Sequence, residues 1–273
     1  IENEQSRAEE KVALAIKNIR GIEKDSFLTK VGKAYMTILG DGKGGIFCED
    51  SLEQPKNWSE LTKNSIKLES FDISFSNPPF GKDIKVTGKE KLAQYELNYG
   101  QKEGNVSTLF LERNLQLIKK GGRLAIILPE TYFHAPIARN VRNFIYKHNI
   151  QWLIDIPHDT FRPHNNAKCI ILILQKGVEQ QEYINMAVAE FIGHDHNGNA
   201  IYDSEGNIKD DTIKIIDDIK NKNDDSKYVF KQSSELVVEK DILIPRYYWQ
   251  SKELELIDIA EEKGLNLISL KDL

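Results

Sequence analysis

The sequence predicts an α/β fold built on a mostly parallel sheet with helices on both faces. Two observations carry this prediction. Short apolar segments alternate with segments of helical periodicity between residues 19 and 176, a pattern typical of βαβ units. The segments 123–129 and 169–174 are almost continuously apolar, as parallel strands are when helices cover both faces of their sheet.

The elements of the first half follow from periodicity and turn signals. Residues 4–18 have apolar positions near helical spacing, and residues 26–39 do the same up to Gly40, a plausible helix C-cap. Pro78 and Pro79 end an apolar run because proline cannot donate to a ladder. Short strands are therefore expected at about 19–23, 46–50 and 71–76.

The second half contains longer elements. Residues 82–104 are polar and aperiodic, which predicts a mobile loop, and Gly121-Gly122 is expected to turn the chain. Helices are expected at 105–120 and 135–149, and strands at 123–129, 150–157 and 167–176.

The character of the chain changes after residue 177. Turn signals in the stretches HNGN and SEGN predict one or two hairpins. We therefore expect a catalytic core at 1–177, a hairpin and helical extension at 178–240, and a further segment at 241–273.

Asp195, Asn197 and Asn199 resemble the opening of a calcium loop. The sixth position, however, is Ala200 instead of glycine, and no glutamate closes the loop. Turn chemistry is the favoured interpretation, and no metal site is expected.

The composition restricts the class of protein. Of the 273 residues 40% are hydrophobic, enough for a sizeable core, and no stretch approaches 18 consecutive apolar residues. The charged N-terminal segment is unlike a signal peptide. Cys48 and Cys169 lie far apart with no CxxC spacing, which fits a reducing cytoplasm and no metal site. No membrane partner is expected.

The clearest chemical signal is the motif Asn77-Pro78-Pro79-Phe80, which ends the strand at 71–76. Open α/β sheets bind ligands at the carboxyl ends of their strands. The Asn77 side chain and the Pro78 carbonyl are hydrogen-bond acceptors, the prolines stiffen the turn, and the Phe80 ring offers a stacking face.

Such a turn suits a planar ring that carries an exocyclic amine. Two acceptors would hold both amine hydrogens and stabilise the positive charge that develops as the nitrogen attacks. The competing interpretation is a Pro-Pro strand terminator beside a core aromatic residue.

The motif and its surroundings resemble the N6-adenine DNA methyltransferases. The resemblance is strongest to the modification subunits of type I restriction–modification systems and to related fused modification–specificity enzymes. It covers most of residues 19–212 and is carried by NPPF, by KKGGRLAIILP about forty residues later, and by IPHDTF before AKCIILIL. It implies a class I, Rossmann-like fold that transfers methyl from S-adenosyl-L-methionine to N6 of adenine in double-stranded DNA.

The resemblance gives two short segments, and also Asn77, a role in binding the cofactor. Glu23 would bind the ribose hydroxyls, as a carboxylate suits a diol, while Lys24 replaces the apolar residue usual at that place. Asp50 would accept from the adenine amine of the cofactor, with Ser51 and Leu52 beside it. Taken alone, Glu23 is equally an ordinary surface acid, and Asp50 or Ser51 a helix N-cap.

The resemblance gives the NPPF motif a role in substrate binding. Asn77 to Phe80 would hold an adenine flipped out of the duplex, at a cost of a few kcal/mol that stacking partly offsets. Phe161 would stack on the other face of that adenine, although a core phenylalanine is an equally good interpretation.

One part of the family pattern is missing. A glycine-rich loop should precede Glu23, yet residues 1–22 contain no glycine pair, and GDGKGG follows the second helix instead. With isoleucine at position 1, we expect an N-terminally truncated enzyme that could be inactive in isolation.

The expected partners are DNA, a specificity subunit or fused target-recognition domain, and a restriction subunit. Residues 241–273 resemble the lead-in to a target-recognition domain. The competing interpretation is a helix and a strand that complete the present domain. The net charge of −5 fits a chain whose grip on DNA lies mainly elsewhere.

Two alternatives stay open. NPP-aromatic turns also serve the methylation of guanine amines in ribosomal RNA and of glutamine amides in release factors. The second alternative is a non-catalytic scaffold that only holds a specificity subunit.

Overall fold

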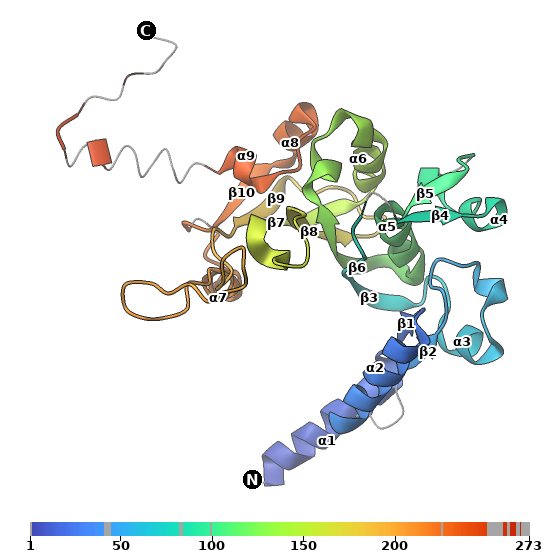
Figure 1. Ribbon diagram of the computed structural model, residues 1–273. Coiled ribbons are helices and arrows are strands. Elements are labelled where there is room, and N and C mark those ends of the chain that lie inside the picture. Colours follow the sequence, from blue (N-terminus) through green and yellow to red (C-terminus); the bar gives the residue numbers. More distant parts are fainter. Residues whose placement is uncertain are drawn as a thin grey trace. The chain divides into compact units, whose positions relative to one another are not determined.

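The computed structural model describes residues 2–40, 45–81, 84–98, 100–224, 226–249, 259–260, 263–265 and 268 (Figure 1). The chain forms two compact units. The first comprises Ile1–Ser74 and Gly81–Gly122, and the second comprises Phe75–Phe80 and Arg123–Leu273. No helix within the described ranges is long and apolar enough to cross a membrane.

The first unit opens with the helices and strands that the periodicity predicts. The parallel strands β1 and β2 form a two-stranded sheet, and the Asp25 carboxylate caps the helix between them by accepting from Leu28 N. These elements are α1 (Glu2–Asn18), β1 (Gly21–Glu23), α2 (Ser26–Ile38) and β2 (Ile46–Cys48), followed by η1 (Pro55–Asn57) and α3 (Glu60–Ser65).

The segment predicted to be a mobile loop, residues 82–104, contains regular structure where it is described. Strand β4 (Lys85–Thr87) pairs antiparallel with β5 (Glu103–Asn105), and α4 (Lys89–Leu92) and η2 (Glu96–Asn98) lie between them. Residues 82, 83 and 99 are outside the described residues.

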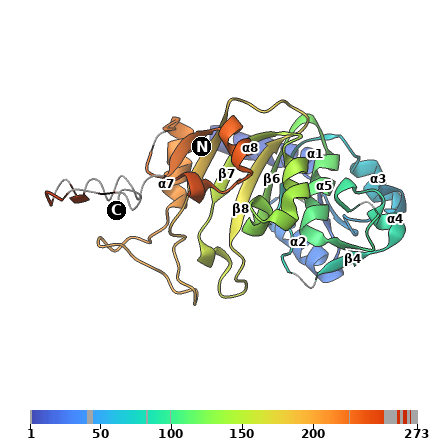
Figure 2. The ribbon, with the colours of Figure 1, turned by 90° about the horizontal axis from the view of Figure 1, so that it is seen from above.

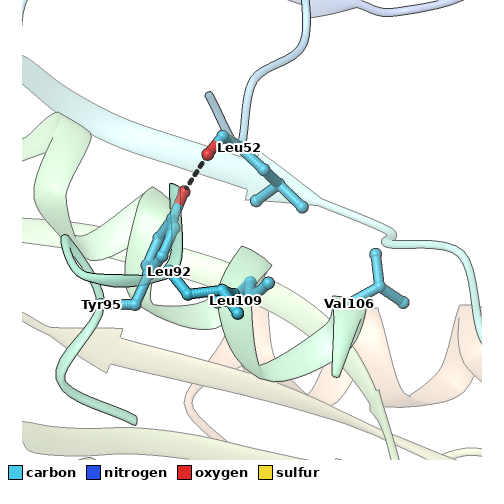
Figure 3. Packing of buried hydrophobic residues seen from close by; sticks show 5 residues of the cluster. All are labelled: Leu52, Leu92, Tyr95, Val106 and Leu109. Carbon is cyan, nitrogen blue, oxygen red and sulfur yellow. Dashed lines mark hydrogen bonds between the residues drawn. The ribbon is translucent and has the colours of Figure 1, made fainter. Parts of the chain in front are cut away.

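Two side chains anchor this segment in a small core beside α5 (Val106–Leu117). Leu92 and Tyr95 are almost fully buried with Leu52, Val106 and Leu109 (Figure 3). The prediction of a mobile loop was wrong because the segment has too few apolar residues to show a periodic pattern. Its polar part is held instead by α5, where the Glu112 carboxyl group accepts from Glu96 N and Leu97 N.

A six-stranded sheet has the order β10-β9-β7-β8-β6-β3. The first residues of β3 and β6 belong to the first unit, and the rest of the sheet belongs to the second unit. Strand β8 is antiparallel to β6 and β7, β9 is parallel to β7, and β10 is antiparallel to β9. Figure 2 shows β6, β7 and β8 from above. The strands are β3 (Phe71–Ser76), β6 (Ile118–Pro129), β7 (Asn149–Asp155), β8 (Cys169–Gln175), β9 (Tyr183–Val188) and β10 (Val229–Ser233).

The α/β class is confirmed, but this sheet is mixed and not mostly parallel. The apolar runs of β6 and β8 indicate burial on both faces, which does not fix strand direction. Residues 156–168, between β7 and β8, form only the short turn η5 (His158–Phe161), too little for the helical crossover that parallel neighbours need.

The pair Gly121-Gly122 lies inside β6 and does not turn the chain. Gly121 has a φ of 79°, a conformation that glycine reaches without strain. A Cβ on Gly122 would lie 3.0 Å from the Asp72 carbonyl oxygen. The two glycines therefore allow an irregular backbone within β6, at the place where the sequence predicted a turn.

The predicted hairpins after residue 190 are confirmed as two consecutive turns. Asp195 Oδ1 accepts from the main-chain N–H of Asn197 and Asn199, and Asp203 repeats this arrangement eight residues on. Turn chemistry thus accounts for the residues that resembled a calcium loop.

The α-helices of the second unit lie between and after its strands in the sequence. They are α6 (Arg139–Ile145), α7 (Thr212–Asn221), α8 (Ser234–Lys240) and α9 (Pro245–Tyr248), with the turns η3 (Glu130–Phe133) and η4 (Pro136–Ala138) before α6. Most of the segment expected at 241–273 lies outside the described residues beyond Trp249.

Candidate active site

The NPPF motif follows β3 directly and belongs to the second unit. Pro78 is buried, Phe80 is half-buried, and Asn77 and Pro79 are exposed. A buried proline with a fixed φ holds the turn, while the Asn77 amide remains open to solvent. The motif can therefore present a hydrogen-bond acceptor from a rigid backbone.

The structure brings two predicted site residues together. The rings of Phe80 and Phe161 are 5.3 Å apart between centroids, with an interplanar angle of 65°. This edge-to-face pair contributes about 1 kcal/mol beyond its burial. It leaves no gap for a third ring, so a base held between both faces would require Phe161 to leave this contact.

A buried carboxylate group holds the main chain that leads to Phe161. Asp155, the last residue of β7, has a fully buried side chain that accepts from Lys168 Nζ and, at 3.2 Å, from Arg246 Nη2. Lys168 Nζ also donates to the Ile156 carbonyl at 2.6 Å. The main chain between β7 and η5 is thus fixed by charge-assisted hydrogen bonds.

The predicted cofactor residues other than Asn77 lie in the first unit, at the carboxyl end of its small parallel sheet. Glu23 ends β1, and Asp50 follows two residues after β2. Lys24 Nζ lies 3.0 Å from Asp50 Oδ2, so the two segments are adjacent in space. Glu23 is half-buried, and one of its carboxylate oxygens accepts from Asp25 N at 2.8 Å.

The Asp50 carboxylate is charged at neutral pH. Burial raises the pKa of Asp50, but hydrogen bonds from Lys91, Lys24 and Leu52 N outweigh burial, and the pKa lies below its usual value. Lys91 Nζ is 2.7 Å from Asp50 Oδ2. A charged acceptor of this kind can bind an aromatic amine.

The N-cap interpretation of Asp50 and Ser51 is wrong. The next α-helix, α3, begins after Ser59, whose side chain is its cap. Asp50 Oδ1 instead accepts from Leu52 N at 3.0 Å within a tight turn. The carboxylate is therefore free of any role at a helix end.

The sequence reasoning missed the residues that hold residues 50–53, here called the Asp50 loop. Trp58 Nε1 donates to the Asp50 carbonyl at 3.0 Å, the Tyr95 hydroxyl to the Leu52 carbonyl at 2.8 Å (Figure 3), and Arg113 Nη2 to the Glu53 carbonyl at 3.0 Å. The one signal in the sequence was the Glu112-Arg113 pair inside an otherwise largely apolar helix.

Comparison with known proteins gives a family match over most of the chain. Residues 2–255 match the model of the family described as N-6 DNA Methylase. A protein of Methanocaldococcus jannaschii described as a type II restriction enzyme and methyltransferase is 27% identical over 132 residues, which is 48% of this chain and 11% of that protein.

Two solved structures share the fold. The methyltransferase subunit of a type I restriction–modification system from Streptococcus thermophilus has a TM-score of 0.63 at 18% identity, covering 84% of this chain and 48% of its own. A protein of Listeria monocytogenes described as a class I S-adenosylmethionine-dependent methyltransferase has a TM-score of 0.52 at 20% identity, covering 75% and 55%. The chain thus spans about half of each structure, and its fold is that of a class I methyltransferase.

Proposed function

The chain belongs to the N-6 DNA Methylase family, and on that premise we propose that it methylates N6 of adenine in double-stranded DNA. The observation that carries the proposal is the NPPF turn after β3, with Pro78 buried and Asn77 exposed. We assign the chain to a restriction–modification system, as its relatives' descriptions suggest.

The chemistry follows from the acceptors of the turn. The Asn77 amide oxygen and the Pro78 carbonyl would accept from the two hydrogens of the adenine amine and so direct the nitrogen lone pair out of the ring plane. Both acceptors would stabilise the positive charge that develops on N6 as its new bond to the methyl carbon forms, while the bond from that carbon to the sulfur of the methyl donor would break and leave its electrons on sulfur. The extra proton of N6 is then lost to solvent.

The residues of the first unit fit the proposed cofactor, S-adenosyl-L-methionine, which supplies an electrophilic methyl group when bound. Asp50 is a charged acceptor for an aromatic amine, and the Glu23 carboxylate suits the two ribose hydroxyls. Ser51 and Leu52 would line the adenine beside Asp50. Lys24, an ion-pair partner of Asp50, would hold that carboxylate in its charged form.

Phe80 and Phe161 would form the stacking surface for a flipped adenine. Their present contact supports the assignment because it places Phe161 beside the NPPF turn. The unstacking of a base would be offset partly by stacking on one or both rings.

The proposed partners are double-stranded DNA, a specificity subunit or fused target-recognition domain, and a restriction subunit. The net charge of −5 agrees with DNA contacts supplied largely by such partners. We keep the division into a catalytic core at 1–177, an extension at 178–240 and a lead-in at 241–273, and a cytoplasmic location, as parts of this proposal.

Asn77→Ala tests the proposal. In the protein within its active assembly, we expect kcat for DNA methylation to fall about 100-fold or more, because one preorganised group that stabilises the transition-state charge is lost. Cofactor affinity should fall far less than kcat, because Glu23 and Asp50 are proposed to hold the cofactor as well. Transfer of a radioactive methyl group to plasmid DNA, measured with saturating cofactor, gives kcat.

Asn221→Ala is the matched control, since Asn221 is an exposed asparagine at the end of α7 in the same unit. Full methylation by the Asn77→Ala variant would contradict the proposal. Methyl transfer by the native protein to RNA or protein in place of DNA would favour an enzyme that acts on those substrates. Binding of the native protein to its specificity subunit without any methyl transfer would favour a non-catalytic scaffold.

A further inference from the structure

Arg113 is buried in the middle of α5 without a carboxylate partner. Its exposed fraction is 1%, and it forms no ion pair within the described part of the chain. Its Nη1 atom has no hydrogen-bond partner there either. The Glu112 carboxyl group interacts with this charge electrostatically but forms no ion pair with it. Burial of a charge without an ion-pair partner is costly, and an apolar side chain would fill the same space, so packing alone does not explain an arginine here.

Neutral groups surround the guanidinium. Nη2 donates to the Tyr95 hydroxyl at 2.8 Å and to the Gln94 side chain, and Nε donates to the Tyr95 hydroxyl at 3.1 Å. The Cζ atom lies 5.1 Å from the Tyr95 ring centre and 5.8 Å from that of Trp58. Two aromatic rings thus supply part of the stabilisation that an anion would give.

The groups around Arg113 all contact the Asp50 loop. Arg113 itself donates to the Glu53 carbonyl. Tyr95 and Gln94 each donate to the Leu52 carbonyl, at 2.8 Å and 3.1 Å, and Trp58 donates to the Asp50 carbonyl. Three carbonyl groups of this loop are therefore held by Arg113 and its immediate neighbours.

The Tyr95 hydroxyl links Arg113 to Leu52 in one direction only. A guanidinium can only donate and a carbonyl can only accept, so the hydroxyl accepts from Arg113 and gives its own proton to Leu52. Burial raises the pKa of Tyr95 to about 12, and the hydroxyl keeps that proton at neutral pH. Leu52 N in turn donates to Asp50 Oδ1, so the position of Leu52, together with Lys91 and Lys24 at Oδ2, sets the direction of the Asp50 carboxylate.

We propose that Arg113 is a positioning residue for cofactor recognition, which acts through Tyr95 to fix Leu52 and aim Asp50 at the adenine amine. The inference rests on the proposed function, because that function assigns the adenine amine to Asp50. It adds a buried residue that touches neither cofactor nor substrate but determines selectivity for the adenine ring.

Tyr95→Phe gives the most direct test, because it removes only the hydroxyl that links Arg113 to Leu52. The probes are S-adenosylhomocysteine and S-inosylhomocysteine, whose base carries a carbonyl in place of the 6-amino group. Calorimetry on the protein in its active assembly should give a native preference of about 30-fold for the adenosyl compound, the worth of one hydrogen bond to a charged acceptor.

In Tyr95→Phe we expect affinity for the adenosyl compound to fall about tenfold and affinity for the inosyl compound to stay within about twofold. The preference therefore shrinks to a few-fold. A general loss of structure would lower both affinities alike and leave the ratio as it is, and that outcome overturns the inference.

Tyr146→Phe is the matched control. Tyr146 is a partly buried tyrosine of the second unit whose hydroxyl donates to Asp241 Oδ1 at 3.3 Å. Its loss should leave the adenosyl preference at the native value. A fall in the ratio equal to that of Tyr95→Phe would show that any lost hydroxyl has this effect, and would overturn the inference.

Asp50→Asn distinguishes a failure of the cofactor assignment of Asp50 from a failure of the positioning role of Arg113. If Asp50→Asn keeps the native ratio, Asp50 does not read the adenine amine, and the cofactor assignment fails together with the inference. If Asp50→Asn abolishes the preference but Tyr95→Phe does not, the assignment holds and only the positioning role of Arg113 fails.

Discussion

The two units hold their functional segments with buried charges of opposite sign. In the first unit the buried group is a cation, Arg113, surrounded by carbonyl, hydroxyl and amide oxygens and two rings. In the second it is an anion, Asp155, surrounded by the cations Lys168 and Arg246. Both arrangements fix main-chain carbonyl groups next to residues of the candidate site.

The two units differ in the kind of groups that stabilise the buried charge. A guanidinium is planar, delocalised and weakly hydrated, so neutral acceptors and aromatic faces can replace a counter-ion. A carboxylate is compact and strongly hydrated, and the fully buried carboxylate of Asp155 is compensated by two charged donors. Removal of the cation should therefore leave only neutral unpaired groups in the first unit, but an under-compensated anion in the second.

The largest effect is expected for Lys168→Met. Asp155 is fully buried and would keep only the 3.2 Å hydrogen bond from Arg246, so the free energy of unfolding should fall by about 3–4 kcal/mol. Urea denaturation measures this fall. The control is Arg246→Met, which removes the longer and more exposed contact and should cost about 1 kcal/mol.

A smaller effect is expected for Arg113→Met. Acceptors at Tyr95, Gln94 and Glu53 lose a donor, but no charge is left unpaired, and methionine fills much of the space. We expect a loss of about 2 kcal/mol in the same denaturation experiment. If Arg113→Met lowers the free energy of unfolding more than Lys168→Met does, a buried charge left without its partner is not what distinguishes the two units.

The smallest effect concerns the pH dependence of stability. The hydrogen bonds from Arg142 lower the pKa of Asp241, at 2.8 Å from Nε and 2.7 Å from Nη2. A lowered pKa in the folded state gives stability that is present above the unfolded pKa of about 3.9 and is lost as the pH falls through the folded value. Asp241→Asn should therefore cost about 1–2 kcal/mol at pH 7 and progressively less below about pH 4.

Glu112 in the first unit should show the opposite sign. Burial raises its pKa, despite hydrogen bonds from Leu97 N and Glu96 N, so its contribution is present below the unfolded pKa and lost as the pH rises through the folded value. The stability of Glu112→Gln relative to the native protein should thus rise with pH above about 4.5. Urea denaturation at several pH values gives the free energy of unfolding of each variant relative to the native protein. If this difference changes with pH in the same direction for Asp241→Asn and Glu112→Gln, the contrast between the units does not exist.

Local patterns predicted much of the fold. The capped helix α2, the short strands β1 to β3 and the apolar strands β6 to β8 follow from periodicity and from turn residues that act over a few positions. In the candidate site, the position of the NPPF turn after β3 agrees with the structure. The contact of Phe80 with Phe161 and the pair of Lys24 with Asp50 bring together residues that the sequence pointed to separately, and the roles assigned to them stay predictions.

Long-range pairing was not predictable in the same way. The direction of β8 depends on how little chain separates it from β7, and apolar content carries no such information. The segment around α4 is ordered by contacts with α5 and with the Asp50 loop, so its own sequence has no period to detect.

The chemistry of the NPPF turn follows from its residues alone, because proline fixes the backbone and asparagine supplies an acceptor whatever surrounds them. The side chains that hold the two functional segments, in contrast, depend on how distant parts of the chain pack together. Arg113 reaches Glu53 across sixty positions of the chain, and Arg246 reaches Asp155 across ninety-one. Polar contacts of such separation leave no periodic trace, since each depends on the packing of elements that come together only in the folded protein.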